Sequence, residues 1–330
     1  MTERKYSERL GVLSDAQLQA ALDRFDLGDL LAAEPAPMGL FGQNVFLTTA
    51  KGEYVLRGAP YPSWRFEKEQ FLTRLLHEQT DVPVPWPFDI DPRDDIFGWS
   101  YAVMPKMPGV QVGDPAVRTS LTAKEKQALA RAMGENLARM HSLTWPRCGE
   151  YDPDAVSIKP IDTTFAEWAV VRIRRWLDLC LAASDVTTSE DVAWVESIIA
   201  SGRGALDVPF EPTFVHHDYK ENNAVAERTG AGWRITGVFD VGGGYFGDPE
   251  EDLARSVATY AMEDVALARA FLAGYQAQRS FRSGFTERFP MYMLADRLVI
   301  WEYGQRNKVW FDESAVLREW AGWYTALNLA

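Results

Sequence analysis

The chain has 330 residues, of which 47% are hydrophobic and 25% are charged, as in an ordinary soluble globular protein. This length favours two domains or lobes with a sizeable core. The net charge of −13, from 34 basic and 47 acidic side chains, argues against a nucleic-acid-binding surface. The same charge favours a cationic or neutral partner, although an acidic balance also serves solubility alone.

The cysteines and the apolar segments place the chain in a reducing, aqueous compartment. Cys148 and Cys180 lack the spacing of a metal site, which predicts free thiols. Residues 1–5 are polar with no apolar run behind them, and no stretch approaches the length of a membrane span. We therefore expect a cytoplasmic monomer or homodimer, with neither a membrane nor a nucleic acid as its partner.

Hydrophobic periodicity predicts a strand-rich unit in the first hundred residues. Alternating apolar residues on both sides of the Lys51-Gly52 turn are typical of a hairpin. Ser63 has the side chain of a helix cap. The expected elements are one or two helices over 14–32, a hairpin over 44–57, a helix from Ser63 to about 79, and strands near 86–90 and 99–104.

The remainder of the chain has a helical pattern, interrupted by a strand-and-loop region over 213–240. Pro105 and Pro108, next to Gly109, break the regular pattern and mark a linker. Thr122 and Glu125 form a capping-box pair that opens a long helix. The expected division is residues 1–104, a hinge over 105–109 and residues 110–330, with further helices over 162–183, 188–202 and from 248 onward.

The residues that carry chemistry lie between 214 and 254. Asp218 follows a short strand and stands five residues before Asn223, and Asp240 ends another strand seventeen residues later. Phosphoryl transfer needs a carboxylate that orients or deprotonates the attacking hydroxyl, and oxygen ligands for Mg²⁺ beside the nucleotide. We predict that Asp218, flanked by His216, is catalytic and that Asn223 and Asp240 are metal ligands. The alternative is that these polar residues only cap loops.

This segment resembles the aminoglycoside phosphotransferase family of the protein-kinase-like superfamily. The family's catalytic loop reads H-G-D-x-x-x-x-N, which matches His216, Asp218 and Asn223, and its metal segment ends in G-D-P-x-x-D-L-A, which matches 247–254. The resemblance implies an α+β, protein-kinase-like fold, with a small β-rich N-terminal nucleotide-binding lobe and a large, mainly helical C-terminal lobe. It also implies transfer of the γ-phosphate of ATP or GTP, with Mg²⁺, to a hydroxyl of a small molecule.

Two residues of the loop depart from the family pattern. His217 replaces the usual Gly, and Lys220 stands where the family often has His. Lys at that position resembles the eukaryotic protein-kinase loop, so Lys220 contacts the γ-phosphate or is a solvated surface lysine. The first lobe has no G-x-G-x-x-G loop, no A-P-E sequence follows the motif region, and seven residues between Asp240 and Asp248 are too few for an activation loop. These features exclude a protein kinase.

By resemblance, the first lobe supplies the nucleotide site. Gly42 lies in the expected phosphate-covering hairpin, although a plain turn glycine explains it equally well. Arg57 takes the strand position of the family's Lys and is expected to pair with Glu69, with Glu67 as the rival. The backbone from Met104 to Lys106 is expected to hold the base.

Two groups of residues bear on the second lobe. Asp248 is expected to cap a helix, and Asp252, by resemblance, to brace the catalytic loop. Acidic residues that suit a cationic acceptor, unless they form a solvated helix face, are Glu263, Asp264, Asp296, Glu302, Asp312, Glu313 and Glu319. The C-terminal aromatic residues are expected to be mostly core, with stacking on an acceptor as the alternative.

Three functions fit these observations. The leading prediction is a Mg²⁺-dependent phosphotransferase for an aminoglycoside-type antibiotic, which would make it a resistance enzyme. The second is a metabolic kinase of the same fold that acts on choline, a sugar or an amino acid. The third is a non-catalytic nucleotide-binding regulator, against which the intact Asp218, Asn223 and Asp240 argue.

Overall fold

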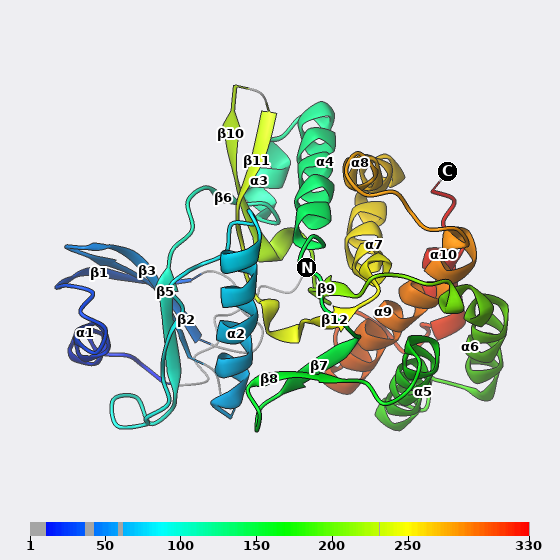
Figure 1. The fold of residues 1–330 in the computed structure, drawn as a ribbon, viewed down its shortest axis with the longest axis horizontal. Coiled ribbons are helices and arrows are strands. Elements are labelled where there is room, and N and C mark those ends of the chain that lie inside the picture. Colours follow the sequence, from blue (N-terminus) through cyan, green and yellow to red (C-terminus); the bar gives the residue numbers. More distant parts are fainter. Residues whose placement is uncertain (1–10, 37–42, 59–61, 231, 330) are drawn as a thin grey trace.

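The computed structural model describes residues 11–36, 43–58, 62–230 and 232–329. Figure 1 shows a strand-rich lobe formed by the first third of the chain, beside a larger and mainly helical lobe. This is the α+β architecture expected from the sequence. No helix in these ranges is both long and apolar enough to cross a membrane.

The first lobe is an antiparallel sheet with strand order β1-β2-β3-β5-β4, accompanied by two helices. Its elements are α1 (Asp15–Asp23), β1 (Leu30–Pro35), β2 (Gln43–Thr49), β3 (Gly52–Gly58), α2 (Trp64–Gln79), β4 (Asp89–Asp91) and β5 (Tyr101–Pro105). The predicted hairpin is β2–β3, in which Thr49 pairs with Gly52. Leu47 and Leu56 of this hairpin are buried in a core that also contains Leu18 and Leu22 of α1.

Two local predictions in this lobe were wrong. The helix expected over 14–32 ends at Asp23, because the chain turns through left-handed residues at Asp26 and Gly28 and then pairs with β2 as an edge strand. Ser63 does not cap α2, because its own backbone is helical and its side chain makes no capping hydrogen bond. In both places, non-local pairing and backbone conformation override the local signal.

The second lobe contains the remaining elements. They are β6 (Val110–Gln111), α3 (Pro115–Ser120), α4 (Ala123–Met140), β7 (Gly149–Asp152), β8 (Ser157–Pro160), α5 (Phe165–Ala183), α6 (Ser189–Gly202), η1 (Arg203–Asp207), β9 (Thr213–Val215), η2 (Glu221–Asn223), β10 (Ala224–Thr229), β11 (Gly232–Val238), η3 (Val241–Gly243), β12 (Tyr245–Gly247), η4 (Pro249–Asp252), α7 (Leu253–Glu263), α8 (Val265–Gln276), α9 (Phe285–Asn307) and α10 (Leu317–Thr325). The Thr122–Glu125 capping box of α4 is present as predicted.

Close packing of α4 against α8 forms the centre of this lobe. Gly134 of α4 and Gly274 of α8 face each other's backbone, and a Cβ at either position would collide with main-chain atoms of the partner helix. The two helices can therefore approach closely only with glycine at these positions. Below these helices β9 pairs with β12, and beside α4 β10 pairs with both β11 and β6 (Figure 1). The 216–223 loop follows β9, and Asp240 follows β11 and contacts Arg57 of the first lobe, so this segment lies at the boundary between the lobes.

The C-terminal aromatic residues form core packing, as expected for most of them. Trp301 is fully buried, packs against Phe311 and Trp320, and donates its indole N–H to Thr187. Trp310 and Trp323, in contrast, are about half exposed. Cys148 and Cys180 are free thiols.

Candidate active site

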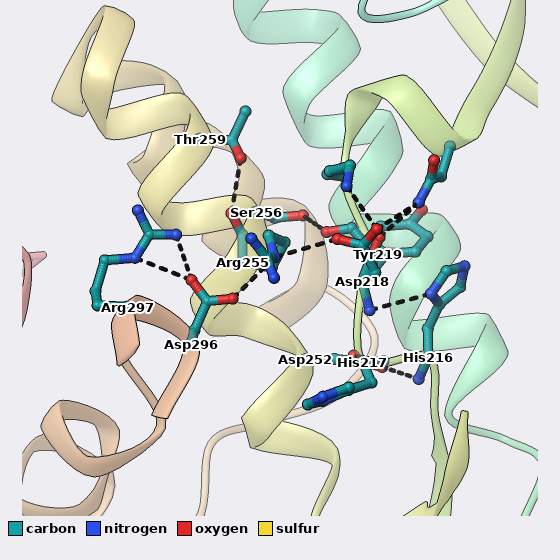
Figure 2. Close-up of polar contacts among 12 residues, drawn as sticks. His216, His217, Asp218, Tyr219, Asp252, Arg255, Ser256, Thr259, Asp296 and Arg297 are labelled. Carbon is teal, nitrogen blue, oxygen red and sulfur yellow. Dashed lines mark hydrogen bonds and ion pairs between the residues drawn. The ribbon is translucent and has the colours of Figure 1, made fainter. Parts of the chain in front are cut away.

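The loop that follows β9 is held by a buried carboxylate at the start of α7. Asp252 accepts hydrogen bonds from the backbone N–H groups of His216 at 2.6 Å and His217 at 2.7 Å (Figure 2). It also lies 3.3 Å from Nε2 of His141, whose Nδ1 is 2.9 Å from the Tyr275 hydroxyl. Burial lowers the pKa of His141. Asp252 thus braces the loop from below, as the resemblance implied.

His216 is fully buried, and both of its ring nitrogens are engaged. Its Nδ1 accepts from the backbone N–H of Asp218 at 3.3 Å, so the ring proton is on Nε2, which donates to the carbonyl oxygen of Phe239 at 3.1 Å. This arrangement joins the 216–218 loop to the strand that precedes Asp240. The contacts of His216 therefore orient the backbone.

Asp218 has one carboxylate oxygen that accepts hydrogen bonds and one that is in an ion pair without a hydrogen bond. Its Oδ2 accepts from Lys220 Nζ at 2.5 Å and from Asn223 Nδ2 at 3.1 Å. Its Oδ1 lies 3.2 Å from Arg255 Nε but accepts no hydrogen bond from the residues that the structure describes. A buried carboxylate oxygen with unused acceptor capacity can receive the proton of a hydroxyl.

Arg57 of β3 joins α2 to the end of β11. Its guanidinium contacts Glu69 Oε1 and Asp240 Oδ1, each at 2.8 Å. The pair expected between Arg57 and Glu69 is present. Burial raises the pKa of Glu69 to about 7, although Arg57 opposes this. Desolvation would also raise the pKa of Asp240, but Arg57 outweighs it and holds that pKa below its usual range.

The oxygens near Asp240 suit Mg²⁺ that arrives with phosphate groups. Asn223 turns its amide nitrogen toward Asp218, which leaves its carbonyl oxygen for a cation. Asp240 uses Oδ1 for Arg57, and its side chain is 45% exposed. No cluster of three or more His, Cys, Asp or Glu within the described ranges could hold a metal ion by itself. A Mg²⁺ site typically has only one or two protein ligands, and phosphates and water supply the remaining ligands.

The residues expected to hold the base lie at the end of β5. Met104 is buried against Phe66 and Phe88. The backbone N–H of Lys106 donates to the carbonyl oxygen of Glu53, and its Nζ is 2.9 Å from Glu53 Oε1. This amide is therefore already engaged within the protein. Gly42 lies outside the described residues.

On the other side of Asp218, acidic and basic side chains alternate. Figure 2 shows Arg255 between Asp218 and Asp296, and its Nε is 2.8 Å from Asp296 Oδ1. Asp296 also pairs with Arg297. Nearby, Arg172 of α5 lies 3.2 Å from Glu251 and 3.4 Å from His217. Burial would raise the pKa of Glu251, but Arg172 and His217 hold it at about 2, so this carboxylate is ionised at neutral pH.

Two adjoining cavities open between α5, α9 and the catalytic loop. The larger encloses about 360 Å³, including its open mouth. His217, Glu251 and Tyr292 line both cavities. Arg255 and Asp296 line the smaller one, beside Asp218. The site thus has a polar part at the loop and a largely apolar wall farther away.

Several acidic residues predicted to face an acceptor are paired within the protein. Glu263 contacts Lys126 at 2.6 Å and also Arg118, and Glu302 contacts Arg306 at 2.6 Å. Asp264 caps α8, and Asp312 accepts from the backbone N–H of Ser314. Asp296 is the member of the set that lies beside Asp218, and it is paired with arginines.

Sequence reasoning missed Arg172 and Arg255. Arg255 comes three residues after Asp252, one helical turn along, which places both on the face of α7 directed at the loop. That spacing could have identified it. Arg172 stands among other arginines on a long helix, and no local signal separates it from them.

The bilobal fold, the Asp218–Asn223 loop and the Arg57–Asp240 pair define a small-molecule O-phosphotransferase with a protein-kinase-like fold. Residues 32–285 match the sequence family described as "Phosphotransferase enzyme family". The chain belongs to this family.

Curated relatives and solved structures agree with this assignment. Homoserine kinase of Burkholderia mallei (strain SAVP1) is 28% identical over 318 residues, which cover 88% of this chain and 85% of the relative. Homoserine kinase of Burkholderia ambifaria (strain MC40-6) is 26% identical over an alignment that covers 88% of this chain and 84% of the relative. The solved structure of aminoglycoside phosphotransferase APH(4)-Ia superposes with a TM-score of 0.68 at 17% identity, covering 94% of this chain and 96% of that one. That similarity shows the shared fold.

Proposed function

We propose that this phosphotransferase moves the γ-phosphate of ATP or GTP, with Mg²⁺, to the hydroxyl of a small hydroxylated amino acid. The observation that carries the proposal is the alternation of carboxylates and guanidiniums beside Asp218. Solved structures of the same fold are complexes with ADP, AMP-PNP or GDP, which supports the nucleotide as co-substrate. The segment 105–109 would be the hinge, since β5 ends at Pro105 and β6 already pairs with β10 of the second lobe.

In the reaction, Asp218 would orient the acceptor hydroxyl and accept its proton on Oδ1. Lys220, held against Oδ2 of the same carboxylate, would neutralise charge on the phosphoryl group as it transfers. His216 would keep the loop backbone in place. These three residues are the ones that the sequence motif predicts as catalytic.

The nucleotide would lie on the opposite side of the loop. Arg57, oriented by Glu69, would bind the phosphates through its planar fork. Asn223 and Asp240 would hold Mg²⁺, which neutralises phosphate charge when bound. The backbone near Met104 and Lys106 is the proposed contact of the base, through groups other than the N–H of Lys106, which already donates to Glu53.

The charge arrangement argues for a zwitterionic acceptor. A polycation needs unpaired carboxylates, but Asp296 and Glu251 already face arginines. An amino acid carries one group of each sign and can bind both partners of such a pair. The relatives named homoserine kinase act, by name, on an acceptor of this kind.

The aminoglycoside predicted from the sequence is the second candidate. Solved structures of this fold are complexes with hygromycin B, at a TM-score of 0.65, and with kanamycin, at the same score. The net charge of −13 would attract such a polycation. Binding would require the acceptor's amino groups to displace arginines from their carboxylates.

The test is release of ADP or GDP by the purified protein with Mg²⁺, across hydroxylated amino acids, choline, sugars and aminoglycosides. Asp218→Asn serves as the blank. Stimulation by L-homoserine or a similar amino acid, absent in the variant, supports the proposal. Stimulation by aminoglycosides alone would replace it with the second candidate. Nucleotide binding without turnover of any acceptor would favour a regulator.

A further inference from the structure

His217 has a backbone conformation that favours glycine. Its φ is 69°, in the left-handed region, where a Cβ is strained. The related family motif has Gly at this position, which would be free of that strain. The chain nevertheless carries a histidine, held by the hydrogen bond from its backbone N–H to Asp252. A strained non-glycine residue beside a reacting group suggests that its side chain has a function.

The imidazole of His217 bridges two groups of the acceptor cavity. Its Nδ1 lies 3.5 Å from Glu251 Oε1, and its Nε2 lies 3.4 Å from a terminal nitrogen of Arg172. Arginine can only donate, so Nε2 accepts and the ring proton is on Nδ1, facing Glu251. His217 also packs edge-on against Tyr245. The ring is therefore fixed in position and tautomer.

These contacts fix the guanidinium of Arg172 in turn. It donates to the Tyr245 hydroxyl at 3.0 Å and to Glu251 at 3.2 Å, and it lies 4.2 Å from the centre of the Trp168 ring. Arg172 lines the larger cavity, beside Ile173 and other apolar residues. A rigid guanidinium next to an apolar wall suits a carboxylate attached to a short carbon chain.

The positions of Arg172 and Arg255 determine which of them can bind the carboxylate end of an acceptor. Arg255 lies 3.2 Å from Asp218 Oδ1, where the reacting hydroxyl must sit. Arg172 is reached across His217, in the adjoining cavity. A short chain between hydroxyl and carboxylate would therefore extend from Asp218 toward Arg172.

We propose that His217 is a specificity-determining residue, strained in order to hold Arg172 as the binding partner of the acceptor's carboxylate. The proposal rests on the proposed function, since it requires a small hydroxylated acid or amino acid as acceptor. His217 acts through Arg172 and is a positioning residue.

The experiment measures binding by calorimetry to the protein saturated with ADP and Mg²⁺. The probes are L-homoserine, 4-hydroxybutyrate, which lacks the amino group, and 3-aminopropan-1-ol, which lacks the carboxylate. Wild type is expected to bind both acids and to bind the amino alcohol at least about tenfold more weakly, because a charged hydrogen bond is lost. No binding of either acid by wild type overturns the proposal.

Variants of His217 separate the effect of its side chain on binding from the effect of its backbone strain on stability. His217→Gly and His217→Ala should each weaken binding of the acids about tenfold and leave ADP binding unchanged. His217→Gln should retain most of the affinity, because the amide oxygen of glutamine can occupy the position of Nε2 and accept from Arg172. His217→Gly should unfold about 1–3 °C above His217→Ala, since only alanine is strained there.

A double variant tests whether His217 acts through Arg172. Combining His217→Gly with Arg172→Met should weaken acid binding no more than Arg172→Met alone. Arg174→Ala, on the same helix but in an exposed pair with Glu196, is the control and should bind like wild type. Additive losses, or wild-type affinity in His217→Gly, overturn the proposal. Acid binding that follows these expectations, but without turnover, would instead count against the proposed function alone.

Discussion

Arg57 and Asp240 form an ion pair of 2.8 Å although 183 residues separate them in the chain. Arg57 belongs to the hairpin of the first lobe, and Asp240 follows β11 of the second. Because Glu69 contacts the same guanidinium, this arginine lies between two carboxylates. The pair joins the lobes at the point where the phosphates of a nucleotide are expected.

Replacing Arg57 should weaken nucleotide binding in particular. We expect Arg57→Ala to raise the KM for the nucleotide about 10- to 100-fold, because a charged phosphate contact is lost and two carboxylates remain facing each other. Arg57→Lys should lie between this variant and wild type, since lysine cannot bridge both carboxylates. Arg24→Ala, which removes a pair with Asp91 elsewhere in the lobe, is the control. An unchanged nucleotide KM in Arg57→Ala would contradict the assignment.

Asp252→Asn should slow turnover without weakening substrate binding. The carboxylate accepts from the backbone of His216 and His217 and faces His141, and an amide offers only one accepting oxygen. We expect kcat to fall about 10- to 100-fold and the unfolding free energy to fall by about 1–3 kcal/mol, because a buried N–H loses its acceptor. Steady-state kinetics and thermal unfolding measure both effects. A kcat equal to that of wild type would show that the loop does not need this brace.

Lys220→Met distinguishes a phosphate contact from a solvated lysine. Because Lys220 is held 2.5 Å from Asp218, its removal should lower kcat by about 10²–10³-fold. Lys51→Met removes an exposed pair with Asp26 and should change nothing. A loss confined to the KM of the acceptor would assign Lys220 to acceptor binding instead.

Glu221 should make the stability of the protein depend on pH. Burial raises the pKa of Glu221 to about 7, although Arg118 opposes this. In the unfolded chain its pKa is near 4.5. Between these values the folded state holds a proton that the unfolded state releases, so this residue's contribution to stability falls as pH rises.

The variant Glu221→Gln removes that titration. The unfolding free energy of the variant relative to wild type should therefore increase from pH 4.5 to pH 7, by on the order of 1–3 kcal/mol. Other groups titrate alike in both proteins and cancel in the difference. Denaturant unfolding at several pH values measures the difference in unfolding free energy between variant and wild type. A difference that does not change with pH would mean that Glu221 is ionised throughout.

The local sequence predicted much of the fold and the loop that carries Asp218 and Asn223. Capping residues such as Thr122 with Glu125 act within one helical turn, so the start of α4 was predictable. The spacing of Asp218 and Asn223 likewise reflects one short loop, in which Asn223 donates to Asp218. Where pairing is non-local, as for β1 against β2, the prediction of a continued helix was wrong.

The acceptor side was decided by tertiary structure. Sequence alone showed an acidic chain and suggested carboxylates for a cationic acceptor, yet folding brings Arg255 to Asp296 and Arg172 to Glu251. The charge presented by a site depends on which side chains meet, and these come from helices distant in the sequence. The residues proposed to act on the hydroxyl and the metal thus lie within one continuous motif, whereas the proposed selection of the acceptor depends on contacts that only the folded chain creates.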